Sequence, residues 1–440
     1  MNILTVDFGS TYTKVTAINE GIIGTAKAFT TVETDIGEGL RTAMKELEKQ
    51  TGKISYEKKL AASSAAGGLK MVAVGLVPGL TAKAAHLAAT SAGAKVIKTY
   101  SYELSRDEMQ EIHETNPDLV LLSGGTDGGN KEVIIKNAKN LAEIDRGFPV
   151  IVAGNKTVRH EVQKILMGGS KHAVGVDNVM PTLDSLDIMP AKAAINRLFM
   201  EKIVEAKGLG EVSNLMDAPI IPTPLAVFLA AEIASNELGT LAAVDVGGAT
   251  TDVYSVTEGA PTKRGVIPKG LPEPYTKRSV EGDIGMRYSL ESLIEAEPKS
   301  EGFGEFLAKC ARDPSYVPKG GTNDGRLDAL LCTKAVKIAL QRHSGFLEKV
   351  YTPMGEAFYQ FGKDLTDVKY LVGIGGALVF SEEPKKILED ALKKDEISLQ
   401  LTPKNPHFLF DKKYIFAAMG LLSQVNKKLA AKIMLREVTP

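Results

Sequence analysis

The sequence predicts an α/β protein made of two related halves, with a doubly wound α/β subdomain inserted in the first half. The first observation is an internal repeat, ILTVDFGSTYTKV at residues 3–15 and LAAVDVGGATTDV at residues 241–253. Each copy reads as an apolar strand, a tight Asp-x-Gly turn and a second strand rich in Thr and Val, which is typical of a β-hairpin. The second observation is an alternation of strand-like and helix-like runs over residues 71–177, which indicates βαβ units and a parallel sheet.

The inserted region divides into short apolar runs separated by amphipathic ones. One helix is expected to begin with the capping box formed by Ser105 and Glu108, because this pair satisfies free backbone donors of a first helical turn. A second helix is expected over residues 131–144, where apolar residues recur at helical spacing. The predicted strands are residues 71–76, 96–100, 119–122 and 150–152.

These patterns give domain boundaries. We expect a first half at 1–235, with the inserted Rossmann-like subdomain at about 71–180, and a second half at 236–440. The C-terminal helix of the second half is expected to pack either on its own half or on the first half. The expected elements of the second half are a mostly helical region over 284–362, a strand at 370–373 that leads to a glycine turn, and a last helix over 414–432.

Composition excludes several classes of protein. With 53 basic and 54 acidic residues the chain has no global field for nucleic acid or for an anionic membrane. Its two cysteines, Cys310 and Cys332, are too few for a disulfide framework. The N-terminus opens directly into a predicted strand, and the apolar segments are too short to span a bilayer. We therefore expect a cytoplasmic protein, without nucleic acid or membrane as a partner and with its oligomeric state open.

Asp-x-Gly hairpins suit phosphate chemistry. Their glycines let backbone N–H groups approach phosphate oxygens, and carboxylates hold Mg²⁺, usually through its waters. Alone, either hairpin has a structural turn as its simpler interpretation; two copies 238 residues apart favour function. The hydroxyls that add donors are Ser10, Thr11, Thr13, Thr250 and Thr251.

The two hairpins and three further segments resemble the signature elements of the actin, Hsp70 and sugar-kinase ATPases. The first phosphate loop is similar to residues 7–11 followed by Lys14, and the second, 245–252, is close to the Hsp70 pattern DLGGGTFD. The resemblance implies an actin-like fold, in which two ribonuclease-H-like halves surround a nucleotide cleft. The remaining matches are two interdomain connections at 222–227 and 417–420, where small residues let helices cross closely, and an adenosine loop at 373–377.

The resemblance also implies roles for individual residues. Asp7 and Asp245 would face each other across the cleft and position Mg²⁺ and the attacking water, and Asp252 would be a second catalytic carboxylate. Lys14 would neutralise γ-phosphate charge, with a solvated strand lysine as the alternative. The predicted nucleotide-binding residues are Gly9, Ser10, Thr11, Thr13, Lys14, Gly247, Gly248, Ala249, Thr250, Thr251, Glu281, Gly282, Asp283, Gly373, Gly375, Gly376 and Ala377.

Two of the segments have structural alternatives. Glu281, Gly282 and Asp283 place two carboxylates around a glycine at an expected helix start, where Asp283 is alternatively a helix cap. The glycine-rich stretch 123–129 follows a buried strand, where open α/β sheets bind ligands, and is alternatively a simple turn.

The motif combination DFGSTYTK, LVLLSGGTDGGN, DVGGATTDV and RSVEGDIGMR is similar to that of the glutamate mutase accessory proteins of anaerobic bacteria. That family is often labelled MutL, a name shared with an unrelated mismatch-repair ATPase. The resemblance implies a weak ATPase that acts as a reactivating chaperone of a coenzyme-B12-dependent mutase or aminomutase. It would couple ATP binding and hydrolysis to the release of damaged cobalamin, so that adenosylcobalamin can enter.

Part of the inserted subdomain, residues 92–126, resembles the middle of a B12-binding Rossmann domain but lacks the Asp-x-His-x-x-Gly motif. One hypothesis is that the subdomain mimics the cobalamin subunit of the mutase; the alternative is a generic βαβ insertion.

Three other functions stay open: a small-metabolite kinase, a dehydratase-activator-type ATPase and a filament-forming actin. An activator would need an iron–sulfur cluster between subunits, and we expect none because Cys310 and Cys332 lie in helix-like contexts without flanking glycines.

Overall fold

The two copies of the Asp-x-Gly repeat fall in different units of the computed structural model. Unit 1 comprises residues 1–227, 270–272 and 417–429, and unit 2 comprises 228–269, 273–416 and 430–440. Each unit is described by itself. The structure describes residues 1–9, 12–31, 35–64, 69–183, 185–205, 209–295, 303–313, 316–353, 355–393 and 398–440.

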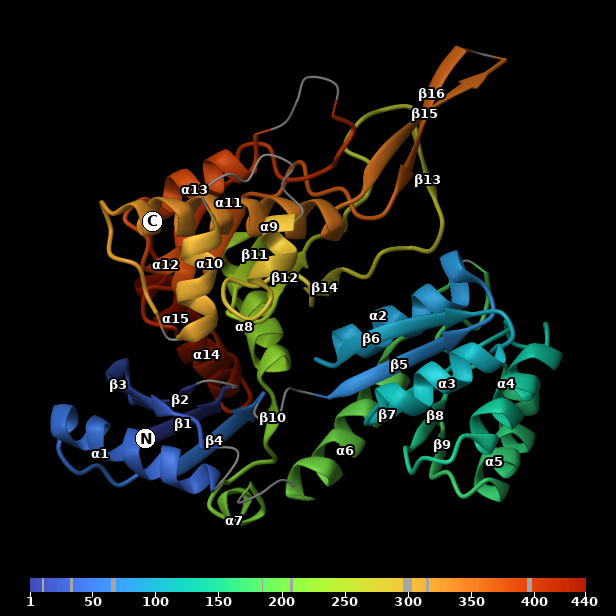
Figure 1. Cartoon of the computed structure of the whole chain (residues 1–440), viewed down its shortest axis with the longest axis horizontal. Coiled ribbons are helices and arrows are strands. Elements are labelled where there is room, and N and C mark those ends of the chain that lie inside the picture. The colour runs from blue at the N-terminus through green and yellow to red at the C-terminus, as the bar shows by residue number, and fades with distance from the viewer. Residues whose placement is uncertain are drawn as a thin grey trace. The chain divides into compact units, whose positions relative to one another are not determined.

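Unit 1 begins with a five-stranded sheet that contains the first hairpin (Figure 1). Strand β1 pairs antiparallel with β2 and parallel with β4; β2 pairs antiparallel with β3, and β4 parallel with β10. Alternate residues of β1 face a core that includes Leu40 and Leu47 of helix α1, whose N-terminus is capped by the Asp35 carboxylate. The elements are β1 (Ile3–Phe8), β2 (Tyr12–Ile18), β3 (Ile22–Phe29), α1 (Ile36–Thr51), β4 (Lys58–Ser63) and β10 (Ile221–Pro222).

A second sheet of unit 1 is parallel throughout, with the strand order β6-β5-β7-β8-β9. Its strands are β5 (Lys70–Gly75), β6 (Lys95–Ser101), β7 (Leu119–Leu122), β8 (Val150–Val152) and β9 (Ala173–Gly175). Its helices are a π-helical turn (Pro78–Ala82) that continues into α2 (Lys83–Ser91), then α3 (Arg106–Thr115), α4 (Glu132–Glu143), a 3₁₀ turn (Lys156–Val158), α5 (Arg159–Gly168) and α6 (Met189–Glu205). The short helix α7 (Leu209–Ser213) follows and contacts α6 and α1.

This parallel sheet is covered on both faces (Figure 1). Met71 and Ala73 of β5 pack with residues of α2 and α6, whereas Val72 and Val74 pack with residues of α3, α4 and α5. Because both faces are buried, the strands are continuous apolar runs. The doubly wound prediction is confirmed, as are the helix over 132–143 and the reciprocal capping box of α3.

Unit 2 repeats the pairing pattern of the first sheet. Strand β11 pairs antiparallel with β12 and parallel with β17; β12 pairs antiparallel with β14, and β17 parallel with β18. Both sheets therefore share one five-strand plan, three antiparallel strands followed by two parallel ones, as expected for the two halves of an actin-like fold. The strands are β11 (Leu241–Val246), β12 (Thr251–Val256), β14 (Thr276–Glu281), β17 (Tyr370–Ile374) and β18 (His407–Phe410).

The helices of unit 2 pack around a core that includes both cysteines. Its own helices are α9 (Leu290–Glu295), α10 (Phe303–Arg312), α11 (Asn323–His343), α12 (Gly376–Val379) and α13 (Pro384–Ala391). Three helices span the division between the units: α8 (Thr223–Leu238), α14 (Phe416–Ser423) and α15 (Lys427–Glu437). Within unit 1, a Cβ on Gly420 of α14 would lie 1.8 Å from the Ala226 carbonyl oxygen of α8, which confirms the predicted close helix crossing.

Two predictions for unit 2 are wrong. The region expected to be mostly helical contains a hairpin, β15 (Phe346–Thr352) with β16 (Gly355–Phe361), which joins β13 (Val266–Lys269) in a small sheet. The last helix is two helices, α14 and α15, because the chain turns after Ser423 and the Asn426 side chain caps the second one by accepting from the Leu429 N–H. None of the described helices has the length and apolar character needed to cross a membrane.

Candidate functional site

The turns of the two repeat hairpins are closed by equivalent hydrogen bonds. The Gly9 N–H donates to the Tyr12 carbonyl at 3.1 Å, and the Gly247 N–H donates to the Thr250 carbonyl at 2.9 Å. A Cβ on either glycine would lie within 2.8 Å of that acceptor oxygen, so neither position accommodates a side chain without rearrangement. The predicted residues Ser10 and Thr11 lie outside the described residues.

Asp7 is placed at the end of the first hairpin strand and is buried. Its Oδ1 accepts a 2.6 Å hydrogen bond from the Thr223 hydroxyl, and its Oδ2 lies 3.9 Å from the Lys14 ammonium. Burial raises the pKa of the Asp7 carboxyl, and the Lys14 charge and the Thr223 hydrogen bond oppose that rise in pKa. Thr223 is the first residue of α8; its segment was expected near the site, but nothing in the sequence assigned it this contact.

The two hairpins carry opposite charges at one matched position of their ladders. Lys14 pairs across the strands with Asp7, whereas Asp252 takes the equivalent place opposite Asp245. The same backbone plan thus presents a carboxylate and an ammonium in unit 1, but two carboxylates in unit 2. Asp245 is half-buried near the C-terminal end of β11, the central strand of its sheet.

Asp252 is held by a buried arginine from the neighbouring strand. The Arg278 Nε and a terminal guanidinium nitrogen lie 2.9 Å and 2.6 Å from Asp252 Oδ1, and the Thr250 hydroxyl donates to Oδ2 at 3.2 Å. The side chains of Arg278 and Asp252 are 4% and 15% exposed. Burial opposes the guanidinium charge, yet the Asp252 charge keeps the Arg278 pKa above its usual range. Arg278 is a residue that sequence reasoning missed.

Two other hydroxyls of the predicted set, those of Thr13 and Thr251, differ in their hydrogen bonding. The side chains of Thr13 and Thr251 are fully buried. Thr13 shares a 3.1 Å hydrogen bond with Thr30, and Thr251 Oγ1 has no hydrogen-bond partner within the part of the chain that the structure describes. Among the predicted turn residues Ala249 is exposed, and Gly248 and Thr250 are half-buried.

A loop after β14 packs against the second phosphate loop. The N–H of Met286 donates to the Gly247 carbonyl, and the N–H groups of Arg287 and Tyr288 donate to the Gly248 carbonyl, at 2.8–3.0 Å. Residues 282–289 therefore form no helix; the expected helix start at Asp283 is wrong, because these backbone donors bind the phosphate loop and α9 begins only at Leu290.

Glu281 and Asp283 are both bound by one side chain from a distant helix. The Arg342 guanidinium of α11 lies 2.9 Å from Glu281 and 2.7 Å from Asp283. Burial raises the pKa of Glu281, whereas the Arg342 hydrogen bond holds the pKa of Asp283 below its usual range. The sequence held no signal for Arg342, which is separated from Glu281 by 61 residues.

The predicted adenosine loop abuts the end of β11. Gly375 has a φ of +94°, and a Cβ on it would lie 2.3 Å from the Val246 carbonyl oxygen, so only glycine fits. A Cβ on Gly376 would lie 2.8 Å from the Tyr414 hydroxyl. Ala377 lies in α12, and Gly373 makes room within β17 for Leu378 and Phe410.

Unit 2 therefore gathers three predicted segments at the C-terminal ends of β11, β14 and β17. They are the phosphate loop at 247–251, the carboxylates at 281–283 and the adenosine loop at 373–377. Unit 1 gathers Asp7, Gly9 and Lys14 in the same way. That the two sets face each other stays a prediction.

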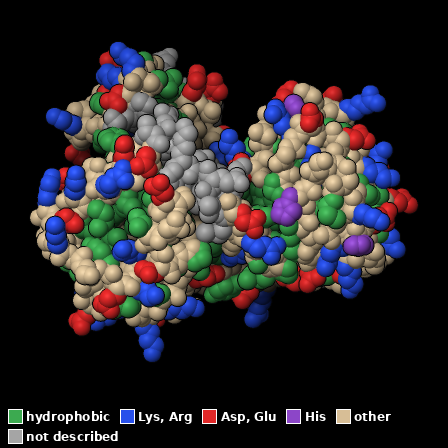
Figure 2. All heavy atoms as spheres, turned by 90° about the horizontal axis from the view of Figure 1, so that it is seen from below, with side chains coloured by type: hydrophobic (Ala, Val, Ile, Leu, Met, Phe, Trp, Pro, Cys, Tyr) green, Lys and Arg blue, Asp and Glu red, His purple; other side chains and the backbone are tan. Residues whose placement is uncertain are grey.

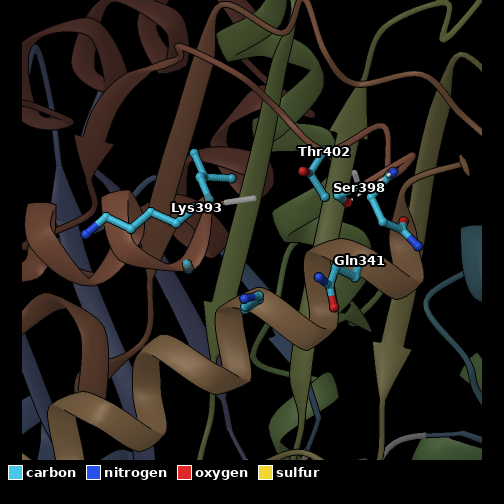
Figure 3. A pocket seen from close by; sticks show the side chains of 8 residues that line it. Gln341, Lys393, Ser398 and Thr402 are labelled. Carbon is cyan, nitrogen blue, oxygen red and sulfur yellow. Dashed lines mark hydrogen bonds between the residues drawn. The ribbon is translucent and has the colours of Figure 1, made fainter. Parts of the chain in front are cut away.

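The pocket drawn in Figure 3 has a polar lining that includes Gln341, Lys393, Ser398 and Thr402, and none of the residues that line it is a predicted site residue. Basic and acidic side chains are interspersed over the face seen in Figure 2.

Comparison with known proteins identifies the family. Residues 3–438 match the model of a family described as MutL protein. A protein of Clostridium tetanomorphum named Protein MutL is 45% identical over 453 residues, covering 98% of each chain.

Among solved structures, a xylulose kinase of Lactobacillus acidophilus is 12% identical with a TM-score of 0.36, covering 100% of this chain and 92% of its own. A glycerol kinase of Plasmodium falciparum, solved with ADP, is 10% identical with a TM-score of 0.35, covering 100% and 93%. These two structural likenesses are too weak to support a conclusion of their own. The family match and the relative show that the family expected from the motifs is right: the chain belongs to the MutL protein family.

Proposed function

We propose that the chain is an ATP-dependent accessory protein that reactivates a coenzyme-B12-dependent mutase or aminomutase of the glutamate mutase type. The observation that carries the ATP part is the pair of Asp-x-Gly hairpins, which are closed by equivalent hydrogen bonds and belong to sheets of one plan in two units. The mutase part rests on the resemblance of the motifs to accessory proteins of that enzyme. The proposed localisation is the cytoplasm.

The residues of the site fit Mg²⁺ bound to a nucleotide. Mg²⁺ keeps several of its waters and takes one or two carboxylates together with phosphate oxygens. Asp7 and Asp245 supply such carboxylates, and within the described ranges no cluster of three His, Cys, Asp or Glu side chains forms a protein-only metal cage. When bound, the ion would neutralise phosphate charge.

The remaining groups would position the phosphates and water. Gly9 and Gly247 would let phosphate oxygens approach the backbone of each turn without a Cβ in the way, and Lys14 adds a positive charge beside the first turn. Asp252, fixed by Arg278 and Thr250, would be a second catalytic carboxylate beside Asp7 and Asp245, which would position the attacking water. Phosphoryl transfer depends mainly on positioning and electrostatics, so a slow ATPase needs no further catalytic group.

Reactivation would follow from the differential affinity of ATP for a closed state of the two halves. A ligand shifts a conformational equilibrium only by that difference in affinity, and hydrolysis removes the γ-phosphate that bridges the halves. The opening would loosen the cobalamin site of a bound mutase. The parallel sheet β6-β5-β7-β8-β9 supports the hypothesis that the inserted subdomain occupies the docking surface of the mutase's cobalamin subunit.

The cysteines argue against the dehydratase-activator alternative. Cys310 and Cys332 are both buried in the core of unit 2, and burial raises the pKa of both thiols. A cluster held between two chains needs thiolates at a surface, which these residues do not provide.

The test uses glutamate mutase blocked with an inactive cobalamin. We would add the chain, adenosylcobalamin and Mg·ATP and follow the recovery of mutase activity, with ATP omitted as a control. Recovery should be lost in Asp252→Asn but kept in Asp367→Asn, a matched change at an exposed position of the same unit. ATP binding without recovery would refute the reactivation role, and transfer of phosphate to a small acceptor would favour a kinase.

A further inference from the structure

An exposed aromatic side chain lies directly beside the adenosine loop of unit 2. Phe380 follows α12, its N–H donates to the Gly376 carbonyl at 3.1 Å, and 61% of the residue is exposed. A single exposed aromatic residue is ordinary on a protein surface. What distinguishes Phe380 is its support by a second, largely buried ring.

The supporting ring is Tyr414, whose centroid lies 5.5 Å from that of Phe380 at an interplanar angle of 44°. Tyr414 has a φ of +54°, a conformation that is costly for a residue with a side chain and that clusters at functional sites. The turn is held by the Asp411 carboxylate, which accepts from the N–H groups of Ile415 and Phe416 at 2.9 Å and 3.0 Å. The ring is therefore fixed by the backbone on which it sits.

Tyr414 also connects the aromatic pair to the phosphate end of the site. A Cβ on Gly376 would lie 2.8 Å from the tyrosine hydroxyl and 3.9 Å from a carbon of the Phe380 ring, so both rings flank this glycine. Burial raises the pKa of the Tyr414 hydroxyl, and the negative charges of Asp245 and Asp411 raise that pKa further. The hydroxyl therefore stays protonated.

The groups of unit 2 are arranged in an order. The Asp245 carboxylate and the Gly247 turn come first, the glycine pair Gly375–Gly376 follows, and an exposed aromatic face comes last. A nucleoside triphosphate has the same order: charged phosphates, a sugar, and a flat aromatic base with a π-face that stacks on aromatic side chains.

Resting on the proposed nucleotide function, we propose that Phe380 is the residue on which the base of the bound nucleotide stacks, and that Tyr414 positions it. Gly376 is required because any side chain there would displace the Tyr414 hydroxyl. The predicted adenosine loop thereby gains a group that contacts the base itself.

The chain contains no tryptophan, so Phe380→Trp introduces a single fluorescent reporter at the proposed stacking face. Mg·ATP should quench this tryptophan, whereas magnesium tripolyphosphate, which has no base, should compete with ATP without quenching. Two reporters serve as controls: Tyr288→Trp, 67% exposed and next to the phosphate loop, and Tyr351→Trp, 78% exposed on the β15–β16 hairpin. Neither should be quenched.

A second measurement separates stacking from folding. Phe380→Ala should weaken ATP about tenfold, leave tripolyphosphate binding unchanged, and be rescued by Phe380→Tyr. Calorimetry on the unsubstituted chain separates a failure of the proposed ATP-dependent function from a failure of the stacking role alone. Absence of ATP binding there would overturn the proposed function and this inference with it. ATP binding with quenching at Tyr288→Trp but not at Phe380→Trp, or with Phe380→Ala binding ATP as tightly as the natural chain, would overturn only the stacking role.

Discussion

The ion pair between Asp252 and Arg278 makes Asp252→Ala a test of stability as much as of catalysis. The substitution removes the carboxylate that accepts both contacts from Arg278, whose side chain is 4% exposed. Breaking a buried pair from one side costs about 3–5 kcal/mol, because the remaining charge is buried without compensation. Arg278 keeps the Tyr254 ring, 5.8 Å from its guanidinium carbon, so we expect the lower end, a loss of about 3 kcal/mol in the free energy of unfolding.

Urea unfolding followed by circular dichroism would measure this loss in four chains: natural, Asp252→Ala, Arg278→Met and the double variant. Replacing both members of a buried pair by apolar groups is often neutral, so the double variant should be more stable than Asp252→Ala alone. Asp367→Ala, at an exposed site of the same unit, should stay within about 0.5 kcal/mol of the natural chain.

Two results would refute this reasoning: an Asp252→Ala chain that unfolds at the natural urea concentration, or a double variant less stable than the single one. If the stability returns in the double variant while ATP hydrolysis stays absent, the carboxylate is needed for the reaction itself and not only to neutralise Arg278.

Three further predictions concern single positions. Gly375→Ala should destabilise the chain by about 3 kcal/mol through a positive φ and a backbone clash, whereas Gly128→Ala, with a positive φ but open space, should cost about 1 kcal/mol in the same urea assay; equal losses would contradict the role of the clash. Thr223→Val removes the hydroxyl that donates to Asp7, so calorimetry should show Mg·ATP affinity falling about tenfold, with Thr223→Ser restoring it; failure of serine to restore it would count against the hydrogen bond. Burial lowers the pKa of His343 well below 6.5, so the unfolded chain binds the proton first and the free energy of unfolding should fall by about 1.4 kcal/mol per pH unit below pH 6.5. A His343→Gln chain with the same pH slope would show that another group causes it.

The parts of the fold that the sequence predicted are those in which local pattern and tertiary environment agree. The two repeat hairpins could be predicted because the backbone of an Asp-x-Gly turn leaves no room for a side chain at the glycine. The inserted strands could be predicted because burial on both faces leaves continuous apolar runs. The hairpin at 346–361 was missed because its strands are partly exposed and carry charged residues among the apolar ones. The loop at 282–289 resembled a helix start because its carboxylates suit a cap, whereas its backbone donors bind a turn far away in sequence.

The missed site residues have a common cause. Thr223, Arg278 and Arg342 act through contacts that span 216, 26 and 61 residues, and no spacing rule links a residue to a partner at such separations. Phe380 and Tyr414 were overlooked for a different reason: an aromatic residue after a short helix has no distinctive pattern, and only the position of Gly376 shows that the two rings flank the loop.

The ladder position occupied by Lys14 in one hairpin and Asp252 in the other makes the two copies of the duplicated hairpin chemically different. Two identical copies would treat both ends of any molecule alike. A triphosphate, however, has a terminal group that is lost and an inner part that stays, so a protein that acts on it has to distinguish head from tail. Opposite charges at one matched position of two hairpins with the same strand pairing supply that distinction. Two copies of a duplicated hairpin can therefore bind the two ends of an asymmetric ligand differently while they keep the same backbone scaffold.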